Sequence, residues 1–200
     1  MITIIDYGLG NLASITNAFD RLSLPSIISN RPNQILKATG LILPGVGAAG
    51  AGMQNLKKTG LDQIIIRFAK TGKPILGICL GMQLLFSQSQ EGNVSCLNLI
   101  SGTVKKFTSK NLKIPQIGWN QVNIINSSRL LNQAPNNSYA YFVNSYYCAP
   151  RQKSAVIATT TYGQSFASVI EQNNLFATQF HPEKSGDFGN IILKNFGGLC

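Results

Sequence analysis

One stretch of the chain decides its fold, Ile75-Leu76-Gly77-Ile78-Cys79-Leu80-Gly81-Met82-Gln83-Leu84-Leu85-Phe86. It begins with a buried strand from Ile75 to Ile78 and continues as a helix predicted from Leu80 to about Ser87. Gly77 and Gly81 stand two residues before and two residues after Cys79. Such glycines permit the sharp strand-to-helix turn that exposes a nucleophile above a sheet. The stretch therefore predicts a nucleophilic Cys79, with an inert buried thiol as the alternative.

Strands and helices alternate on the N-terminal side of this stretch. Apolar runs predict strands from Ile2 to Asp6, from Ser26 to Ser29 and from Leu41 to Leu43. Helical periodicity predicts a helix capped by Asn11 and ending at about Leu22, and another from Leu61 to Thr71. This alternation is typical of a mostly parallel sheet covered by helices on both faces.

Strand-like runs dominate after Gly92. They comprise residues 103–107, 121–125, 139–147, 154–160, 166–171 and 175–180, and a closing helix follows from Asp187 to Phe196. We expect an antiparallel extension of the same sheet, because no Pro/Ser/Gly-rich linker separates the two halves. The predicted fold class is therefore α/β, with a mostly parallel central sheet, helices on both faces and an antiparallel extension. Residues 1–200 are predicted to form a single domain.

Length and composition describe an ordinary globular chain. It has 200 residues, of which 44% are hydrophobic, and a mean hydropathy of +0.09. No apolar run approaches the ~18 residues that a membrane span requires. A strand starts at Ile2 with no signal or transit segment ahead of it. We therefore expect no membrane partner and a protein that works in the cytoplasm or, if organelle-encoded, in a plastid stroma.

The net charge of +10 arises from scarce acidic residues, since 17 Lys and Arg face 7 Asp and Glu. The densest basic group, Lys105, Lys106, Lys110 and Lys113, has no interleaved aromatic residues, and no DNA-binding motif spacing occurs. We therefore expect no nucleic-acid partner. The four cysteines form no Cys-x-x-Cys pair and are accompanied by a single histidine, so we expect reduced thiols and no metal site.

A glycine-rich segment after the first strand, Gly8-Leu9-Gly10-Asn11-Leu12-Ala13, matches the dinucleotide-binding fingerprint. That site also needs an acidic residue at the end of the second strand to hold the ribose. The second strand ends at Ser29-Asn30, and no Asp or Glu occurs between Asp20 and Asp62. We therefore interpret the glycines as a tight turn and expect no nucleotide cofactor.

The only histidine, His181, supplies the base that a nucleophilic cysteine needs. It follows the last predicted strand, and Glu183 stands two residues further on. In an extended segment these side chains point to the same side, so the carboxylate can orient the imidazole. Cys79, at the N-terminus of a predicted helix where the thiolate is favoured, completes a candidate triad.

An acyl-transfer site also needs N–H donors for the developing oxyanion. The amide of Leu80, one residue after the nucleophile, is the first expected donor. The loop Pro44-Gly45-Val46-Gly47 follows a predicted strand, and loops at the carboxyl ends of parallel strands build sites in this architecture. We therefore expect the second donor to come from Val46 or Gly47.

These residues resemble the triad, or class I, glutamine amidotransferases, whose glutaminase domain carries Gly-x-Cys-x-Gly and a distal His-Pro-Glu. The resemblance runs the length of the chain and is closest to one branch, the glutaminase subunits of imidazole glycerol phosphate synthases in histidine biosynthesis. The segments that carry it are residues 6–11, 44–47, 77–86, 114–120, 141–147 and 177–185.

The resemblance implies that Cys79 attacks the side-chain amide of L-glutamine, that His181 relays a proton to the departing ammonia and that Glu183 holds His181. Water then hydrolyses the glutamyl thioester to glutamate, and no cofactor takes part. The residues that the resemblance assigns to the amino-acid end of glutamine are Gln83, Glu91, Asn144, Ser145 and Tyr146.

The resemblance also implies a partner. Ammonia would pass into a barrel-shaped cyclase subunit, forming a heterodimer that makes imidazole glycerol phosphate and AICAR. The family positions at that interface are Asn11, Trp119, Tyr141 and Lys184. We expect the isolated chain to have low glutaminase activity until docking realigns the Val46-Gly47 peptide, which glycine allows at little cost.

The chain departs from this branch in three places. Gln116 and Asn144 stand where the branch usually has histidine, and Ala49-Gly50-Ala51 stands where it has an aromatic residue and an acid. These positions flank the pocket and the cyclase-facing side. One alternative is therefore a paralogous glutaminase that supplies ammonia to a sugar-aminating synthase. Two others are a cysteine peptidase that acts without a partner and a catalytically silent scaffold.

Overall fold

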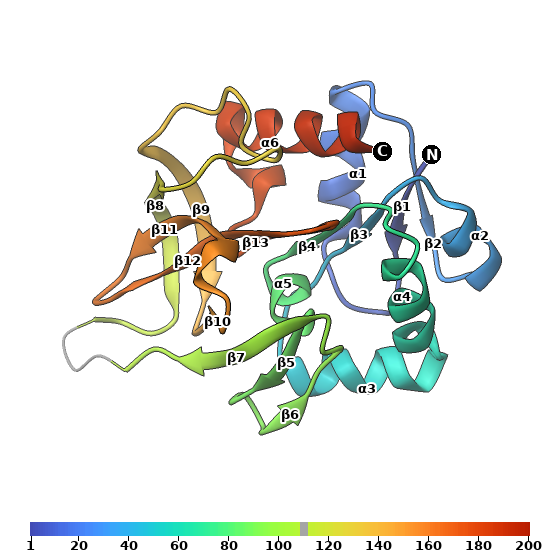
Figure 1. The fold of residues 1–200 in the computed structure, drawn as a ribbon, viewed down its shortest axis with the longest axis horizontal. Coiled ribbons are helices and arrows are strands. Elements are labelled where there is room, and N and C mark those ends of the chain that lie inside the picture. Colours follow the sequence, from blue (N-terminus) through green and yellow to red (C-terminus); the bar gives the residue numbers. More distant parts are fainter. Residues whose placement is uncertain (109–111) are drawn as a thin grey trace.

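The fold is built on a single sheet. The computed structural model describes residues 1–108 and 112–200, and within them thirteen strands form one sheet (Figure 1). Five neighbouring strands are parallel to one another, in the order β2 (Ser26–Ser29), β1 (Ile2–Ile5), β3 (Leu41–Leu43), β4 (Ile75–Ile78) and β13 (Leu175–Thr178). Their carboxyl ends therefore lie at one end of the sheet, where α/β folds place their sites.

The remaining strands extend this sheet, and all their pairs are antiparallel except that of β5 with β7. They are β12 (Ser165–Gln172), β10 (Tyr146–Pro150), β7 (Ile100–Lys106), β5 (Phe86–Ser89), β6 (Val94–Ser95), β11 (Val156–Thr161), β8 (Gln116–Ile124) and β9 (Ser138–Asn144). β12 joins the two parts, because it pairs with β13 on the parallel side. β8 and β9 form a two-stranded arm, the β8–β9 ribbon, in which Gln116 lies opposite Asn144.

Helices cover both faces of the parallel strands (Figure 1). One face carries α1 (Leu12–Arg21) and α6 (Gly186–Leu199), and the other carries α2 (Pro32–Lys37), α3 (Ala49–Thr59), α4 (Leu61–Ala69) and α5 (Leu80–Leu84). The two short 3-10 helices are η1 (Lys153–Ala155) and η2 (Pro182–Lys184).

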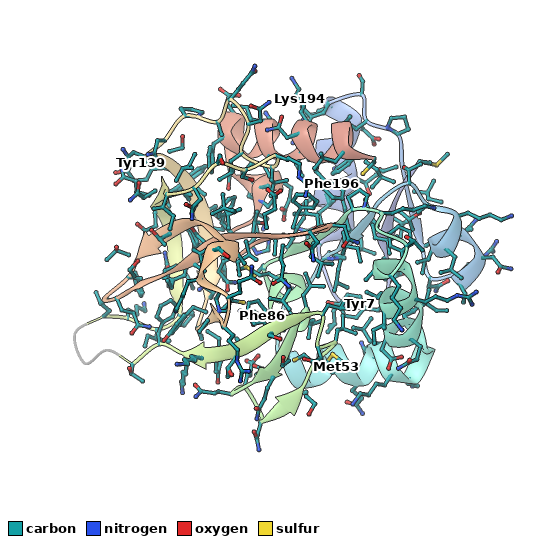
Figure 2. The ribbon with its side chains drawn as sticks, in the orientation of Figure 1. Tyr7, Met53, Phe86, Tyr139, Lys194 and Phe196 are labelled. Atoms are coloured by element: carbon teal, nitrogen blue, oxygen red, sulfur yellow. The ribbon has the colours of Figure 1, made fainter. Side chains whose placement is uncertain are left out.

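Strand side chains alternate between two hydrophobic clusters, one on each face of the sheet. Ile4 belongs to the cluster under α1 and α6, whereas Ile5 belongs to the cluster on the opposite face. Figure 2 shows Phe196 between α6 and the sheet, with Tyr7 and Met53 on the other side. Each fully buried side chain such as Phe196 contributes about 1.5–3 kcal/mol.

The predicted α/β fold class is confirmed, with its helix-covered parallel strands and antiparallel extension. The helix predicted from Leu80 to about Ser87 is wrong at its C-terminal end, since α5 stops at Leu84. Phe86 instead begins β5, where it is fully buried and pairs with Ile100 of β7. Tertiary pairing has overridden the helical periodicity of this segment.

Helix α3 had no sequence signal, because Gly50 and Gly52 disfavour a helix interior. Two tertiary contacts explain it. A Cβ at Gly52 would lie 3.0 Å from the Leu84 side chain, so glycine lets α3 lie close to α5. The backbone N–H of Ala49, at the start of α3, donates to the Glu91 carboxylate at 2.7 Å.

Two expectations from the composition, on membrane spans and on metal sites, concern all of the described residues. No helix in residues 1–108 and 112–200 is both long enough and apolar enough to cross a membrane. The same residues hold no group of three or more His, Cys, Asp and Glu side chains arranged to bind a metal ion. Lys110, one member of the basic group, lies outside the described residues.

Candidate active site

Cys79 occupies a strained turn between β4 and α5. Its φ of +54° lies in a region that non-glycine residues rarely adopt. Its N–H donates to the carbonyl of Thr178 at 2.8 Å, which anchors the turn to β13. A Cβ at Gly77 would lie 2.9 Å from the backbone of Gly81, and a Cβ at Gly81 would overlap the carbonyl of Leu43. Both glycines are therefore required sterically, as the elbow pattern predicts.

His181 lies at the carboxyl end of β13, beside Cys79, and its N–H donates to the carbonyl of Tyr141 at 3.0 Å. Its Nδ1 lies 2.8 Å from Oε1 of Glu183, and these side chains are 6% and 1% exposed. A second side-chain hydrogen bond joins the ring to Cys79. Because Glu183 engages Nδ1, Nε2 is the nitrogen that faces the sulfur. The structure thus brings the three predicted triad residues together.

Contacts with Cys79 and Glu183 raise the proton affinity of His181. Burial disfavours the charged imidazolium, but the hydrogen bonds with Cys79 and Glu183 outweigh it and raise the pKa of His181 to about 10. The ring is therefore protonated at neutral pH and can donate a proton. Burial raises the pKa of Cys96 to about 11, that of Cys200 to about 12 and that of Cys148 well above its usual range.

A cavity of about 230 Å³ opens above Cys79. The residues that line it are Val46, Gly47, Cys79, Leu80, Gln83, Glu91, Pro115, Val143, Asn144, Ser145, Tyr146 and His181. Every predicted oxyanion and substrate-binding residue is among them, and Pro115 and Val143 are additions that carried no sequence signal. The volume is below the range of about 300–1,000 Å³ for drug-sized ligands and suits a molecule of amino-acid size.

The two predicted oxyanion elements pack against each other. Leu80 is the first residue of α5, so its N–H has no acceptor within the helix. A Cβ at Gly45 would lie 2.8 Å from the Leu80 side chain, which shows how closely the loop after β3 approaches the elbow. Buried Tyr7 donates to the carbonyl of Pro44 at 2.7 Å and braces that loop, and burial raises the pKa of Tyr7 above its usual range. Gly47 has φ of +95° with open space around it.

Polar side chains form the wall opposite this loop. Gln83 Nε2 donates to the carbonyl of Tyr146 at 3.3 Å, and Asn144 Nδ2 donates to the same oxygen at 3.0 Å. Sequence reasoning missed Gln179, which is fully buried beside Cys79. Its position near the end of the predicted strand, two residues before His181, was the available signal. Gln116 is also buried, opposite Asn144, and its amide has no hydrogen-bond partner among the described residues.

Two of the predicted interface positions, Trp119 and Tyr141, lie opposite each other on the outer side of the β8–β9 ribbon. The rings of Trp119 and Tyr141 are 6.1 Å apart, and Lys184 Nζ lies 5.9 Å from the Tyr141 ring. Asn11 stands apart in the chain, where its side chain caps α1 by accepting from Ser14 N–H at 3.2 Å. α1 contacts η2, the turn that carries Lys184.

The outer face of the ribbon is apolar as well as exposed. Ile117, Trp119 and Tyr139 are 64%, 57% and 58% exposed, and Val143 is 38% exposed. Figure 2 shows Tyr139 at the outer margin of the molecule. Large side chains gathered in this way mark an interaction surface in soluble proteins.

Comparison with known proteins gives concordant results. The family model "Glutamine amidotransferase class-I" matches residues 3–197. The imidazole glycerol phosphate synthase subunit HisH of Chlorobaculum tepidum is 46% identical over 198 residues, covering 98% of this chain and 98% of that protein. The HisH subunit of Moorella thermoacetica is 49% identical over 199 residues, covering 99% of this chain and 94% of that protein.

A solved structure extends the similarity to the fold. A crystal structure of a glutamine amidotransferase, 15% identical in sequence, superposes with a TM-score of 0.78 over 100% of this chain and 98% of that chain. At this identity the match supports the fold alone.

Proposed function

This chain belongs to the class I glutamine amidotransferase family and, within it, to the HisH subunits of imidazole glycerol phosphate synthase, and on this premise we propose that its Cys79 pocket hydrolyses L-glutamine. The products are glutamate and ammonia, and the ammonia passes to a cyclase subunit that makes imidazole glycerol phosphate and AICAR. The observation that carries the proposal is the convergence of Cys79, His181 and Leu80 on one cavity of amino-acid size.

The first half of the reaction forms a thioester. The Cys79 sulfur attacks the side-chain amide carbon of glutamine, and the carbonyl oxygen takes up the negative charge. The N–H groups of Leu80 and of the loop at Val46 and Gly47 stabilise that oxyanion. Protonated His181 gives its proton to the amide nitrogen, the carbon–nitrogen bond breaks and ammonia leaves.

The second half regenerates the enzyme. Neutral His181 takes a proton from water as the water oxygen attacks the thioester carbon, and the carbon–sulfur bond breaks to release glutamate and the Cys79 thiolate. Glu183, 2.8 Å from Nδ1, keeps the ring oriented and stabilises its protonated form in both halves. The nucleophile, the base and the oxyanion donors are all protein groups, so the proposed reaction uses no cofactor or metal.

Substrate recognition follows from the polar wall of the cavity. The Glu91 carboxylate lines the cavity and is held by the Ala49 N–H at 2.7 Å, so it offers a fixed negative charge to the ammonium group of glutamine. Gln83 and the backbone from Asn144 to Tyr146 line the same wall and would bind the rest of the amino-acid end. Tyr146 O already accepts two amide hydrogen bonds, which rigidifies this segment.

The outer face of the β8–β9 ribbon is the proposed docking surface for the cyclase subunit. It carries the exposed side chains of Ile117, Trp119 and Tyr139, and the backbone of Val143 on the same ribbon lies 3.7 Å from Cys79 Sγ. A partner that covers this face therefore covers the nucleophile's side of the molecule. Ammonia released there can enter the partner without crossing bulk water, where protonation would remove its nucleophilicity.

No observation on the described residues favours the three alternatives, which are a paralogous glutaminase with another partner, a cysteine peptidase without a partner and a catalytically silent scaffold. The cavity of about 230 Å³ matches one amino acid in size, as a glutaminase requires. Both relatives described above are HisH subunits, which favours the cyclase partner over the sugar-amination alternative.

The proposal is tested by glutamate release from L-glutamine. The wild-type chain and Cys79→Ala are assayed alone and mixed with a histidine-pathway cyclase subunit and its nucleotide substrate, with Cys96→Ala as the matched control. We expect strong stimulation by the cyclase in the wild type and in Cys96→Ala, and none in Cys79→Ala. Turnover that survives in Cys79→Ala would overturn the site, whereas Cys79-dependent turnover that ignores the cyclase would overturn the partner.

A further inference from the structure

A chain of buried amide side chains leads from the substrate wall to the nucleophile. Gln83 Nε2 lies 3.3 Å from Oε1 of Gln179, and Nε2 of Gln179 lies 3.9 Å from Cys79 Sγ. Gln179 is 0% exposed and Gln83 is 5% exposed. An amide is costly to bury unless its donors and acceptors are used. The Gln179 side chain therefore needs its contacts with Gln83 and with the sulfur to offset the cost of burial.

The orientation of the Gln179 amide follows from its neighbours. The carbonyl oxygen of Tyr146 can only accept, so the Gln83 group that faces it must be the NH2 group. That same NH2 group faces Gln179, and it can only donate. Gln179 must therefore present its oxygen to Gln83 and its NH2 group to Cys79. The reverse orientation would place two donors against each other and an oxygen lone pair against the sulfur.

We propose that Gln179 is a further catalytic residue of this site, whose side-chain NH2 group donates a hydrogen bond to Sγ of Cys79, and that Gln83 is the residue that positions it. The inference rests on the proposed function only in taking Cys79 as the nucleophile. A donor aimed at the sulfur favours the thiolate over the thiol, and the thiolate is the attacking species. Helix α5 has only five residues, so its N-terminus stabilises a thiolate weakly. The NH2 group of Gln179 adds a hydrogen-bond donor to the same sulfur.

The backbone keeps Gln179 in place. Its N–H donates to the carbonyl of Ser168 at 2.9 Å, and Thr178 Oγ1 donates to the carbonyl of Phe180 at 3.0 Å. The arrangement also links the substrate wall to the sulfur, because Gln83 lines the cavity and its NH2 group reaches Gln179. A ligand that engages Gln83 would act on the donor to the nucleophile.

Other titratable groups also face the sulfur and must be held constant. They are His181 with its partner Glu183, the phenol of Tyr7, the thiol of Cys148 and, in the cavity, Glu91 and Tyr146. Substituting Gln179 alters none of these groups, so a change in the pH dependence of Cys79 alkylation results from the loss of the Gln179 amide.

The experiment measures how fast iodoacetamide alkylates Cys79 as a function of pH, on the isolated full chain without glutamine. The Cys79 peptide is quantified by mass spectrometry, which separates it from the other cysteines. The variants are Gln179→Met, which keeps the size and removes the donor, and Gln179→Glu, which keeps the shape and replaces the donor with a charge. Gln172→Met, on β12 and away from the site, is the matched control.

We expect the pH midpoint of alkylation to rise by about one unit in Gln179→Met, a tenfold effect at pH below the midpoint. The rise should be larger in Gln179→Glu, because a carboxylate repels the thiolate. Gln172→Met should match the wild type. A folded Gln179→Met or Gln179→Glu with the wild-type midpoint would overturn the proposal. Far-UV circular dichroism and thermal unfolding identify the folded variants, and the isosteric Gln179→Glu covers a failure of Gln179→Met to fold.

A double-mutant cycle tests the role of Gln83. If Gln83 acts through Gln179, Gln83→Met raises the midpoint by less than Gln179→Met does, and the double variant equals Gln179→Met alone. Additive shifts would overturn the positioning role. The alkylation assay uses neither glutamine nor a cyclase, so its outcome does not depend on the proposed function. Glutamate release by the same variants tests the proposed function separately.

Discussion

Glu183→Gln should lower the pKa of His181 by about 2, to about 8, because it removes a charge and keeps the shape. His181 Nδ1 and Glu183 Oε1 are 2.8 Å apart, and both side chains are almost fully buried. The glutamine oxygen can still accept the Nδ1–H hydrogen bond, so the ring stays in place. What is lost is the attraction between the carboxylate and the imidazolium.

The magnitude follows from the proton affinity of the wild-type ring. A pKa of about 10 against the ordinary 6.5 corresponds to about 5 kcal/mol in favour of the protonated ring. Cys79 and Glu183 share this effect and also overcome the cost of burial. Two unit charges about 4 Å apart attract each other by about 4 kcal/mol at an effective dielectric constant of about 20, and a fall of about 2 in the pKa, or about 3 kcal/mol, corresponds to losing most of that attraction.

The assay is an NMR titration of the imidazole protons between pH 5 and pH 11. His181 is the only histidine of the chain, so a single set of signals reports it without assignment. Glu171→Gln is the matched control, since Glu171 also forms an ion pair, with Arg129 at 2.7 Å, on another part of the molecule. Its titration should coincide with that of the wild type. Glutamate release by Glu183→Gln should fall by about 10²-fold or more.

The same shift has a consequence for stability. The pKa of His181 in the folded chain is above its ordinary value, so protonation of the ring increases the free energy of unfolding. This increase is fully present below about pH 6.5 and is lost as the pH rises through about 10. Urea unfolding at pH 6 and pH 10.5 should therefore differ less in Glu183→Gln than in the wild type. A wild-type His181 that titrates near 6.5, or one that Glu183→Gln leaves unchanged, would refute the reasoning.

Three further changes probe the elbow, the oxyanion loop and the docking face. Gly81→Ala would press a methyl group into the carbonyl of Leu43, so its free energy of unfolding in urea should fall by more than about 3 kcal/mol, or the variant should not fold. The control Gly198→Ala, in open space on α6, should raise the free energy of unfolding by up to about 1 kcal/mol. Equal effects of the two substitutions would contradict the packing argument. Gly47→Ala strains a φ of +95° by about 1–2 kcal/mol and should reduce cyclase-stimulated glutamate release by about tenfold, and an unchanged rate would remove this loop from the site. Trp119→Ala, at a side chain 57% exposed, should leave the Tm within a few degrees and weaken cyclase binding by about 30-fold or more in calorimetry, and undiminished binding would place the interface elsewhere.

The sequence alone was informative wherever local sterics decide the outcome. Gly77 and Gly81 on either side of Cys79 predict the elbow, because no residue with a Cβ fits there. The spacing of His181 and Glu183 predicts their contact, which the structure contains, but the extended segment expected there is wrong, because Pro182–Lys184 forms the 3-10 helix η2. The clash at Gly77 is local, since it involves the backbone of Gly81, whereas the clash at Gly81 involves the carbonyl of Leu43, far away in the chain.

The tertiary structure decided what depends on residues far apart in the chain. Helix α5 is short because β7 pairs with the segment that follows it, and α3 forms over Gly50 and Gly52 because Leu84 packs against it. The amide chain from Tyr146 through Gln83 to Gln179 and Cys79 joins residues 63, 96 and 100 positions apart. The direction of each hydrogen bond in it is set by the carbonyl at its end. Periodicity and spacing describe one segment at a time, so this chemistry exists only once the folded sheet brings the four residues together.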